Sequence, residues 1–208
     1  MTELRHPALR RAVFTIAANA ISQLPADTGM EVGFAGRSNA GKSSAVNTIT
    51  GQKSLARTSK TPGRTQQIIF FSLDEQRRLL DLPGYGFAKV PPAIKAHWQN
   101  LMEGYFRERS SLKGLVLVMD ARHPLRDFDQ MMLDWCENTQ TPVHILLTKS
   151  DKLSRGAASA ELQKVRKLVK EWNVEQEVQL FSALNNTGLE PVLAKLALWL
   201  DLESPNAA

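Results

Sequence analysis

The sequence predicts a three-layer α/β fold, with a mostly parallel central sheet, one antiparallel edge strand and helices on both faces. Short apolar runs alternate with longer amphipathic stretches along the 208 residues, a pattern typical of strands joined by helical crossovers. Only four residues separate the run that ends at Leu73 from the run that begins at Arg78. Four residues are too few for a crossover helix, so these two strands should form an antiparallel hairpin.

Six segments have the length and apolar content of strands, and five longer segments lie between turn or capping residues such as Asp127 and Gly188. The predicted strands are Glu31–Ala35, Ile68–Leu73, Arg78–Leu82, Leu115–Asp120, His144–Thr148 and Val178–Ser182. The predicted helices are Ser43–Thr50, Pro92–Ser111, Phe128–Asn138, Ala158–Trp172 and Leu189–Leu200.

Length and composition predict a single domain over residues 1–208. A chain of this length can build one core, and its contents of 43% hydrophobic and 23% charged residues are typical of a soluble globular protein. We expect residues 1–28 to form an N-terminal extension packed on this domain, and residues 203–208 to form a disordered tail. Cys136 is the only cysteine, which excludes an intramolecular disulfide and a cysteine-based zinc site.

The chain is expected to be cytoplasmic, without contact with membranes. Basic residues precede a modestly apolar run near the N-terminus, but Thr15 and Asn19 interrupt that run, which argues against a signal peptide. No apolar stretch approaches the roughly 20 residues that span a bilayer. A net charge of +5 permits a polyanionic partner such as RNA, although charge alone fits a merely basic protein equally well.

Residues 36–43 match the pattern G-x-x-x-x-G-K-S/T between a predicted strand and a predicted helix, the context that the pattern requires. Its glycines let backbone N–H groups converge on phosphate oxygens at a helix N-terminus. Lys42 should reach the β- and γ-phosphates of a nucleotide, and Ser43 should bind Mg²⁺. The predicted phosphate-binding residues are Gly36, Arg37, Ser38, Asn39, Ala40, Gly41, Lys42, Ser43 and Ser44.

A second motif, Asp81-Leu82-Pro83-Gly84, closes a predicted strand at the end where ligands bind in open α/β sheets. Asp81 should act on Mg²⁺ through water, and the N–H of Gly84 can approach the γ-phosphate. Tyr85 stands where a glutamine could orient the attacking water, so the chain lacks that catalytic side chain in cis.

A third motif, residues 148–151, ends another strand and should recognise the base. The Asp151 carboxylate can accept hydrogen bonds from the ring N–H and the exocyclic amine of guanine, whereas adenine offers no matching pair of donors. The aliphatic part of the Lys149 side chain can pack on the face of the base, and the segment 182–184 can supply a backbone N–H for the guanine carbonyl. The predicted base-binding residues are Thr148, Lys149, Ser150, Asp151, Phe181, Ser182 and Ala183.

Together these motifs resemble the Ras-like and Era-like GTPases, and their details are similar to the EngB (YihA/YsxC-like) family of bacterial ribosome-assembly GTPases. The resemblance covers nearly the whole chain. It rests on Gly36-Arg-Ser-Asn-Ala-Gly-Lys-Ser-Ser44, Pro62-Gly-Arg-Thr-Gln66, Asp81-Leu-Pro-Gly-Tyr-Gly-Phe-Ala-Lys-Val-Pro91, Asp120-Ala-Arg-His-Pro124, Thr148-Lys-Ser-Asp151 and Ser182-Ala183.

The resemblance implies a P-loop GTPase fold and a GTP-binding switch with slow, Mg²⁺-dependent hydrolysis. It implies a role in assembly of the large ribosomal subunit and in cell division and septation. It makes Thr65 the switch threonine that binds Mg²⁺ in the GTP state, with Gly63 and Arg64 beside the nucleotide and Thr61 and Thr58 as weaker candidates. Lys42, Thr65 and Gly84 are then the predicted catalytic residues.

The predicted partner is the large ribosomal subunit or its precursor, with no DNA contact and with a monomeric chain. Residues 52–65 lack periodicity and are rich in Ser, Thr and basic residues, a composition typical of a functional or disordered loop. Their position after the phosphate-loop helix favours the functional interpretation. The basic residues of this segment are Lys53, Arg57, Lys60 and Arg64.

Two other functions compete with the switch. One is a P-loop kinase or ATPase that acts on a small molecule, against which the Asp151 motif argues. The other is an RNA- or ribosome-binding module with incidental hydrolysis, and nucleotide competition together with nucleotide-dependent RNA binding would discriminate them. Asn39 also occupies the loop position that, in potassium-activated relatives, offers an amide oxygen to K⁺; a loop-stabilising asparagine is the alternative.

Overall fold

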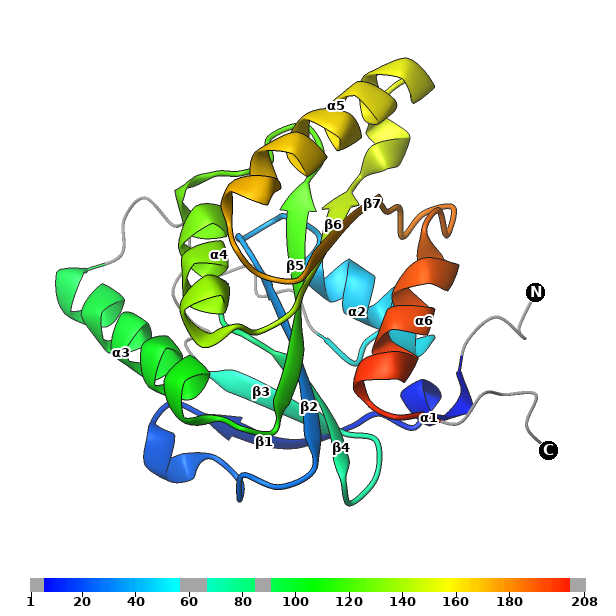
Figure 1. The fold of residues 1–208 in the computed structure, drawn as a ribbon. Helices are drawn as coiled ribbons and strands as arrows, with labels where there is room; N and C mark the ends of the chain where they lie inside the picture. Colours follow the sequence, from blue (N-terminus) through cyan, green and yellow to red (C-terminus); the bar gives the residue numbers. More distant parts are fainter. Residues whose placement is uncertain (1–5, 57–66, 85–90, 203–208) are drawn as a thin grey trace.

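The computed structural model describes residues 6–56, 67–84 and 91–202. A seven-stranded sheet in the order β1-β3-β4-β2-β5-β6-β7 lies between helices (Figure 1). The strands are β1 (Val13–Ala18), β2 (Met30–Gly36), β3 (Ile68–Ser72), β4 (Arg77–Asp81), β5 (Leu112–Asp120), β6 (Val143–Thr148) and β7 (Gln176–Leu180). From β4 to β7 neighbouring strands pair in parallel, whereas β3 is antiparallel to both β4 and β1. The mostly parallel sheet with an antiparallel edge region is therefore confirmed.

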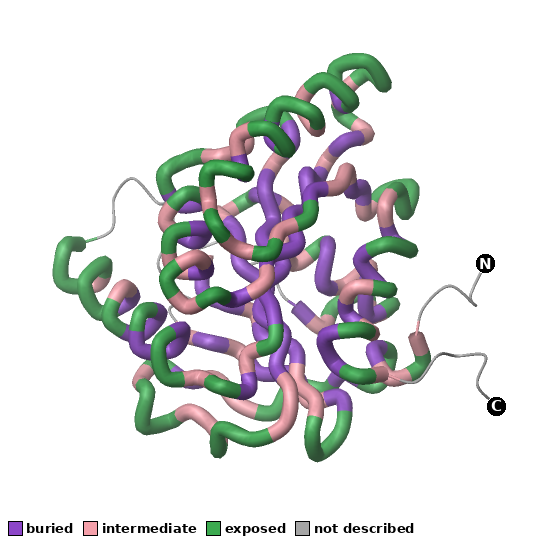
Figure 2. Tube along the Cα trace, in the orientation of Figure 1, coloured by how far each residue is buried: buried purple, intermediate pink, exposed green. Residues whose placement is uncertain are grey.

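The helices cover both faces of the sheet. They are α1 (Pro7–Arg10), α2 (Lys42–Thr50), α3 (Pro92–Glu108), α4 (Asp127–Thr139), α5 (Arg155–Leu168) and α6 (Leu189–Trp199), with 3₁₀ turns η1 (Ile21–Gln23), η2 (Ser150–Lys152) and η3 (Val169–Glu171). Helices α2 and α6 lie on one face, and α3, α4 and α5 lie on the other (Figure 1). The central strands between these layers are buried along most of their length (Figure 2).

Two helices differ from their predicted bounds by three residues or more, for local reasons. The helix expected at Ala158–Trp172 begins at Arg155, because the Ser154 hydroxyl accepts a hydrogen bond from the N–H of Ala157 (3.3 Å) and caps it, and it ends before η3. The helix expected at Pro92–Ser111 stops at Glu108, since the backbone turns extended at Arg109. The Asp27 carboxylate then accepts the N–H groups of the two serines that follow, at 2.9 Å each.

The sheet contains one strand that the sequence analysis did not predict. Strand β1 lies within the expected N-terminal extension and pairs antiparallel with β3, from Val13 opposite Ser72 to Ala18 opposite Ile68. The register shifts between Phe14 and Ile16, which marks a β-bulge. Strand β1, not β3, is therefore the outer strand of the sheet on this side.

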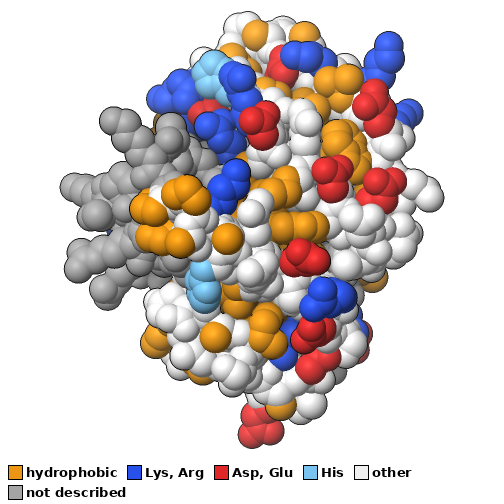
Figure 3. All heavy atoms as spheres, turned by 90° about the vertical axis from the view of Figure 1, so that its left-hand side faces the viewer, with side chains coloured by type: hydrophobic (Ala, Val, Ile, Leu, Met, Phe, Trp, Pro, Cys, Tyr) orange, Lys and Arg blue, Asp and Glu red, His pale blue; other side chains and the backbone are white. Residues whose placement is uncertain are grey.

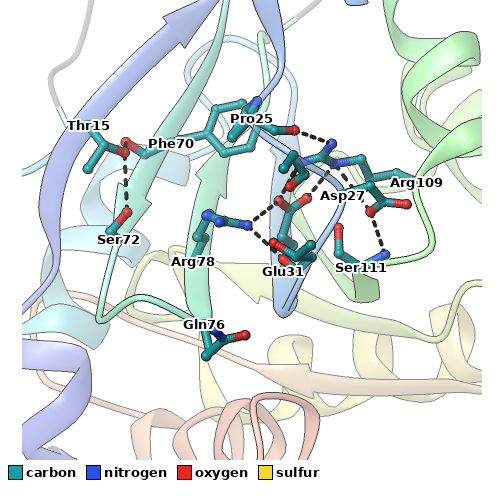
Figure 4. A network of polar contacts seen from close by, with 12 residues as sticks. Thr15, Pro25, Asp27, Glu31, Phe70, Ser72, Gln76, Arg78, Arg109 and Ser111 are labelled. Carbon is teal, nitrogen blue, oxygen red and sulfur yellow. Dashed lines mark hydrogen bonds and ion pairs between the residues drawn. The ribbon is translucent and has the colours of Figure 1, made fainter.

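A buried network of ion pairs and hydrogen bonds stabilises the N-terminal end of β2. The predicted phosphate loop follows the other end of this strand. Glu31 has no exposed surface, and its carboxylate accepts hydrogen bonds from Arg109 (2.7 and 3.0 Å), Arg78 (3.3 Å) and the Tyr105 hydroxyl (2.8 Å). Arg109 also donates to the carbonyl of Pro25 (2.7 Å). Figure 4 shows both guanidinium groups directed at Glu31 from β4 and from the end of α3. The network thus joins the C-terminal end of α3 to β2, to β4 and to the segment that contains Pro25.

Two smaller findings bear on the composition. Within the described ranges, no helix is both long enough and apolar enough to cross a membrane. Cys136 is fully buried in α4, and burial raises the pKa of its thiol. A buried, protonated thiol is an unreactive structural group.

Candidate nucleotide-binding site

The predicted phosphate loop connects the end of β2 at Gly36 to the start of α2 at Lys42. Gly41 caps α2 with φ of 99°, a left-handed conformation that favours glycine. Asn39 also has a positive φ of 62° and is exposed. The loop therefore turns sharply into a helix N-terminus, the arrangement that presents backbone N–H groups to an anion. Of the other predicted members, Ala40 is buried, Arg37, Ser38 and Ser43 are half-buried, and Ser44 is exposed.

Asp81 lies next to this loop because β4 pairs with β2, with Asp81 opposite Phe34. The Lys42 ammonium forms an ion pair with the Asp81 carboxylate, and each side chain is only 12% exposed. Burial lowers the pKa of Lys42, and the adjacent carboxylate opposes that shift by stabilising the ammonium. The structure thus brings together the predicted phosphate-binding lysine and the predicted Mg²⁺-linked carboxylate.

Gly84 also packs against the phosphate loop. A Cβ atom at this position would lie 3.2 Å from the carbonyl oxygen of Gly36 and 3.6 Å from the N atom of Ser38. Only a glycine lets the backbone approach this closely without displacing the loop. Leu82 and Pro83 before it are buried, and the N–H of Leu82 donates to the carbonyl of Phe34 (2.9 Å).

The end of β6 contacts the phosphate loop directly. The Thr148 hydroxyl donates to the carbonyl of Ala40 and lies 3.0 Å from that of Met119. The Lys149 ammonium donates to the carbonyl of Asn39 (2.6 Å) and to the Asp120 carboxylate (2.9 Å). The predicted base-recognition motif is therefore bonded to the predicted phosphate-binding motif.

Asp151 lies beside the loop that follows β7. Its carboxylate accepts a hydrogen bond from the Ser182 hydroxyl (2.6 Å), and this bond is the main reason that the pKa of Asp151 is lowered. Ser150 is bound to the carbonyl of Phe181 through its N–H (3.2 Å) and its hydroxyl (3.0 Å). Ser182 and Phe181 are fully buried, and Ala183 is half-buried beside them. An ionised carboxylate held in this way can accept two N–H groups of a base.

Asp120 is a site residue that the sequence analysis did not assign. It ends β5 opposite Thr148, and its carboxylate binds both Lys149 and the guanidinium of Arg122 (2.7 and 2.9 Å). Burial acts to raise the pKa of Asp120, but the hydrogen bonds from Arg122 and Lys149 outweigh it and lower the pKa. The available signal was a carboxylate at the end of a strand, where ligands bind. On the face drawn in Figure 3, several Lys and Arg side chains lie close together at the upper left, while elsewhere basic, acidic and hydrophobic side chains are mixed.

Some predicted site residues lie outside the described residues. They are Gly63, Arg64 and Thr65, the weaker candidates Thr58 and Thr61, and Tyr85, which stands where a glutamine could orient water.

The described donors suit magnesium. In the described ranges, no group of three or more His, Cys, Asp or Glu residues could hold a metal ion. Mg²⁺ in nucleotide sites, however, uses one or two carboxylates together with substrate phosphates and water. The Ser43 hydroxyl at the start of α2 and the Asp81 carboxylate beside Lys42 are oxygen donors of that kind.

Comparison with known proteins agrees with this geometry. Residues 31–149 match a protein family described as 50S ribosome-binding GTPase. The chain belongs to this GTPase family. The matched region runs from β2 to Lys149 and so contains the phosphate loop, Asp81, Gly84 and the first two residues of the base-recognition motif. The chain is therefore a P-loop GTPase and a GTP-binding switch protein.

Solved structures share the fold of this GTPase. One, described as a probable GTP-binding protein engB, is 20% identical with a TM-score of 0.65, covering 83% of this chain and 100% of the other. Era from Aquifex aeolicus, bound to GDP and AlF₄⁻, is 18% identical with a TM-score of 0.64 and 87% coverage. A GTP-binding protein from Sulfolobus solfataricus in complex with GDP is 22% identical with a TM-score of 0.57 and 84% coverage. The GTPase spans 60% and 53% of the last two chains.

Removing the hydroxyl that holds Asp151 should weaken guanine recognition. In Ser182→Ala the carboxylate loses its 2.6 Å partner, so we expect GTP affinity to fall about fivefold, the value of one hydrogen bond of about 1 kcal/mol. The pKa of Asp151 should rise, so the loss of GTP binding on acidification should begin at a higher pH than in the wild type. Titration of a fluorescent GDP analogue against pH measures both effects. The exposed neighbour Thr187→Ala is the control, and equal affinities for the two variants would contradict the role of Ser182.

Proposed function

We propose that this GTPase is a timer in assembly of the large ribosomal subunit. In this proposal its GTP form binds the subunit or its precursor in the cytoplasm, and hydrolysis or GDP release lets it go. The family match and the basic excess of the chain support the ribosomal partner. A requirement for normal cell division and septation would follow from the supply of ribosomal subunits.

One observation carries the nucleotide part of the proposal. The strand that ends in the base motif is bonded to the phosphate loop through Thr148 and Lys149, while Asp151 stands beside Ser182 in the next loop. A single ligand with a guanine at one end and phosphates at the other fits this continuous arrangement. A kinase or ATPase would require the same site to accept adenine, for which Asp151 is mismatched.

In this proposal, different residues of the chain have different roles in hydrolysis. Lys42 and the N–H groups of the phosphate loop bind and orient the β- and γ-phosphates, and they offset the charge that develops in the transition state. Gly84, packed on Gly36, holds its backbone where it can approach the γ-phosphate. Ser43 and Asp81 would hold Mg²⁺, together with Thr65 in the GTP state, and the ion would supply charge neutralisation at the β- and γ-oxygens.

Sedimentation of ribosomal particles with the purified protein tests the ribosomal partner. We expect the protein to travel with the large subunit or its precursor in the presence of a non-hydrolysable GTP analogue, and to be released with GDP. Replacing Lys53, Arg57 and Lys60 together by Ala should weaken particle binding and flatten its salt dependence while GTP affinity stays nearly unchanged. Arg64 is kept in this variant because it is predicted to lie beside the nucleotide. Absence of binding to large-subunit particles in every nucleotide state at low salt would refute the ribosomal role and leave the GTPase activity standing.

The isolated protein should hydrolyse GTP slowly. Tyr85 cannot orient water as a glutamine does, so we expect on the order of 10⁻⁴ to 10⁻² turnovers per second, as for GTPases without an activating arginine. Ser43→Ala should lower Mg²⁺-dependent turnover further, whereas Ser159→Ala on the exposed face of α5 should not. Phosphate release at saturating GTP measures the rate. A rate of about 1 per second or more without a partner would contradict the argument.

We also propose that K⁺ accelerates hydrolysis through Asn39. Its exposed position in the phosphate loop would let the amide oxygen bind a monovalent cation beside the phosphates, where the ion would substitute for an arginine. The wild-type rate should then be higher in KCl than in NaCl, and Asn39→Ala should remove the difference. Equal rates in the two salts, unchanged by the substitution, would mean that Asn39 only stabilises the loop.

A further inference from the structure

The N-terminal segment exposes large apolar side chains. The described residues include five exposed large hydrophobic residues, and three of them, Val13, Phe14 and Ile21, lie within nine residues of each other in the chain. Phe14 is 60% exposed and Val13 is 58% exposed. An exposed phenylalanine beside an exposed valine on an outer strand is a candidate contact surface.

The local backbone explains why these side chains face solvent and limits what can bind them. The bulge between Phe14 and Ile16 disrupts the alternation of β1, so residues 13–15 are all exposed. The Thr15 hydroxyl donates to the carbonyl of Phe70 (3.1 Å) across the pair. A bulge interrupts the regular row of N–H and C=O groups that another strand would need. This edge is therefore poorly suited to strand addition by another protein or by a second copy of this chain.

The positive charge of the sequence is concentrated in the first 73 residues, which include α1 and β1. Residues 1–73 contain nine Lys and Arg against three Asp and Glu, whereas residues 74–208 contain 17 against 18. The first third of the chain thus carries the whole positive excess. No acidic residue occurs between Glu3 and Asp27, and Arg10 and Arg11 are both exposed.

A side-chain bridge brings Lys53 to this segment. The Gln52 amide donates to the carbonyls of Arg10 (3.1 Å) and Ala12 (2.7 Å), so the loop after α2 lies against the junction of α1 and β1. Lys53, the next residue, is exposed. We define the β1 surface as Arg10, Arg11, Phe14 and Lys53, which are three cations and one exposed aromatic ring.

We infer that the β1 surface binds single-stranded RNA. An exposed aromatic ring offers a stacking face for an unpaired base, and neighbouring Arg and Lys side chains neutralise the phosphates on either side. The bulged edge and the exposed cations Arg10, Arg11 and Lys53 favour this occupant over a protein strand. The inference rests on the proposed ribosomal function for the source of the RNA, and it specifies which part of the chain makes the contact.

Binding at the β1 surface should not depend on the nucleotide. Strand β1 is paired with β3 along its length, and α1 is tied to the loop after α2, so these residues are held by the sheet. Lys53 also belongs to the basic segment 52–65 of the proposed function, for which nucleotide dependence is expected, so Arg10, Arg11 and Phe14 distinguish the β1 surface from that segment.

Fluorescence anisotropy with a labelled single-stranded 12-nucleotide RNA, titrated with the full chain at low salt, tests the inference. We expect equal affinity with GDP and with a non-hydrolysable GTP analogue. Phe14→Ala should weaken binding about 5- to 100-fold, as for loss of one base stack, and Phe14→Trp should retain it. The double variant Arg10→Ala/Arg11→Ala should lower the slope of log affinity against log salt by about 1.4.

The controls remove an exposed hydrophobic residue and a pair of exposed cations from elsewhere. Leu198→Ala and the double variant Lys167→Ala/Lys170→Ala should bind RNA as the wild type does. Unchanged GDP affinity and thermal midpoint would show that the Phe14 variants remain folded. The inference is overturned if the wild type does not bind the RNA, if the Phe14 and arginine variants match it, or if Phe14→Ala only abolishes self-association. Because the probe is free RNA, these outcomes are independent of whether ribosomal particles bind.

Discussion

Replacing Asp151 by Asn should change the base specificity of this GTPase from guanine to xanthine. The carboxylate can accept two N–H groups of guanine, whereas asparagine keeps one uncharged acceptor and turns an NH₂ group toward the exocyclic amine. Losing both hydrogen bonds to a charged group, at about 1.5–3 kcal/mol each, would weaken GTP binding roughly 100- to 10,000-fold. Xanthine carries a carbonyl in place of the exocyclic amine, so the Asn side chain can donate to it. Competition of GTP, XTP and ATP against a fluorescent GDP analogue measures this change in base specificity.

The control for this substitution is Asp201→Asn, which makes the same chemical change at an exposed carboxylate. Asp201 has a positive φ of 48°, which asparagine tolerates. This variant should bind GTP as the wild type does. If the wild type binds ATP as tightly as GTP, or if Asp151→Asn gains no XTP affinity, Asp151 does not recognise the base.

Replacing Arg109 by Ala should strongly destabilise the fold. Glu31 is fully buried, and Arg109, itself 6% exposed, supplies two of its hydrogen bonds. Removing one partner of a buried ion pair leaves an uncompensated charge and costs about 3–5 kcal/mol. Arg78 and Tyr105 still contact Glu31, so we expect about 3 kcal/mol. Urea unfolding should show this loss, and the thermal midpoint should fall roughly 6–12 °C for a chain of this size.

Arg107 provides a matched control on the same helix. It is exposed, and its ion pairs with Glu103 and Glu108 lie on the surface. Arg107→Ala should leave the free energy of unfolding unchanged, because exposed ion pairs contribute little. Arg109→Lys should fall between the wild type and Arg109→Ala, since it keeps the charge without the two-pronged geometry. Equal unfolding curves for Arg107→Ala and Arg109→Ala would contradict a stabilising role of the network.

The sequence predicted the parts of the fold and site that local patterns determine. The phosphate loop needs a strand, a glycine turn and a helix N-terminus in immediate succession, and all three signals lie within residues 31–50. The base motif likewise ends its own strand. The contacts between motifs follow from the parallel order of β4, β2, β5 and β6, which aligns their carboxyl ends.

The features that the sequence analysis missed depend on distant partners. Strand β1 exposes three of its six residues, so it lacks the apolar alternation of a half-buried strand, and its pairing partner lies more than 50 residues away. Glu31 begins the predicted strand, but nothing near it in the sequence indicates that Arg78 and Arg109 will pair with its buried carboxylate. Asp120 acquires its role only through Lys149, 29 residues later. Local periodicity carries no information about such pairs.

The bonds from Thr148 and Lys149 to the phosphate loop also affect how the two halves of the nucleotide contribute to affinity. Guanosine and the phosphate chain do not meet separate subsites, because the strand end that carries the base motif also holds the main chain of the phosphate loop. Each half helps to order the surroundings of the other, so the binding free energies of the two fragments do not add up to that of the intact nucleotide. We therefore expect a mismatched base to be penalised twice, once at Asp151 and again in the alignment of its phosphates for reaction. Discrimination between bases should then be visible in turnover as well as in binding.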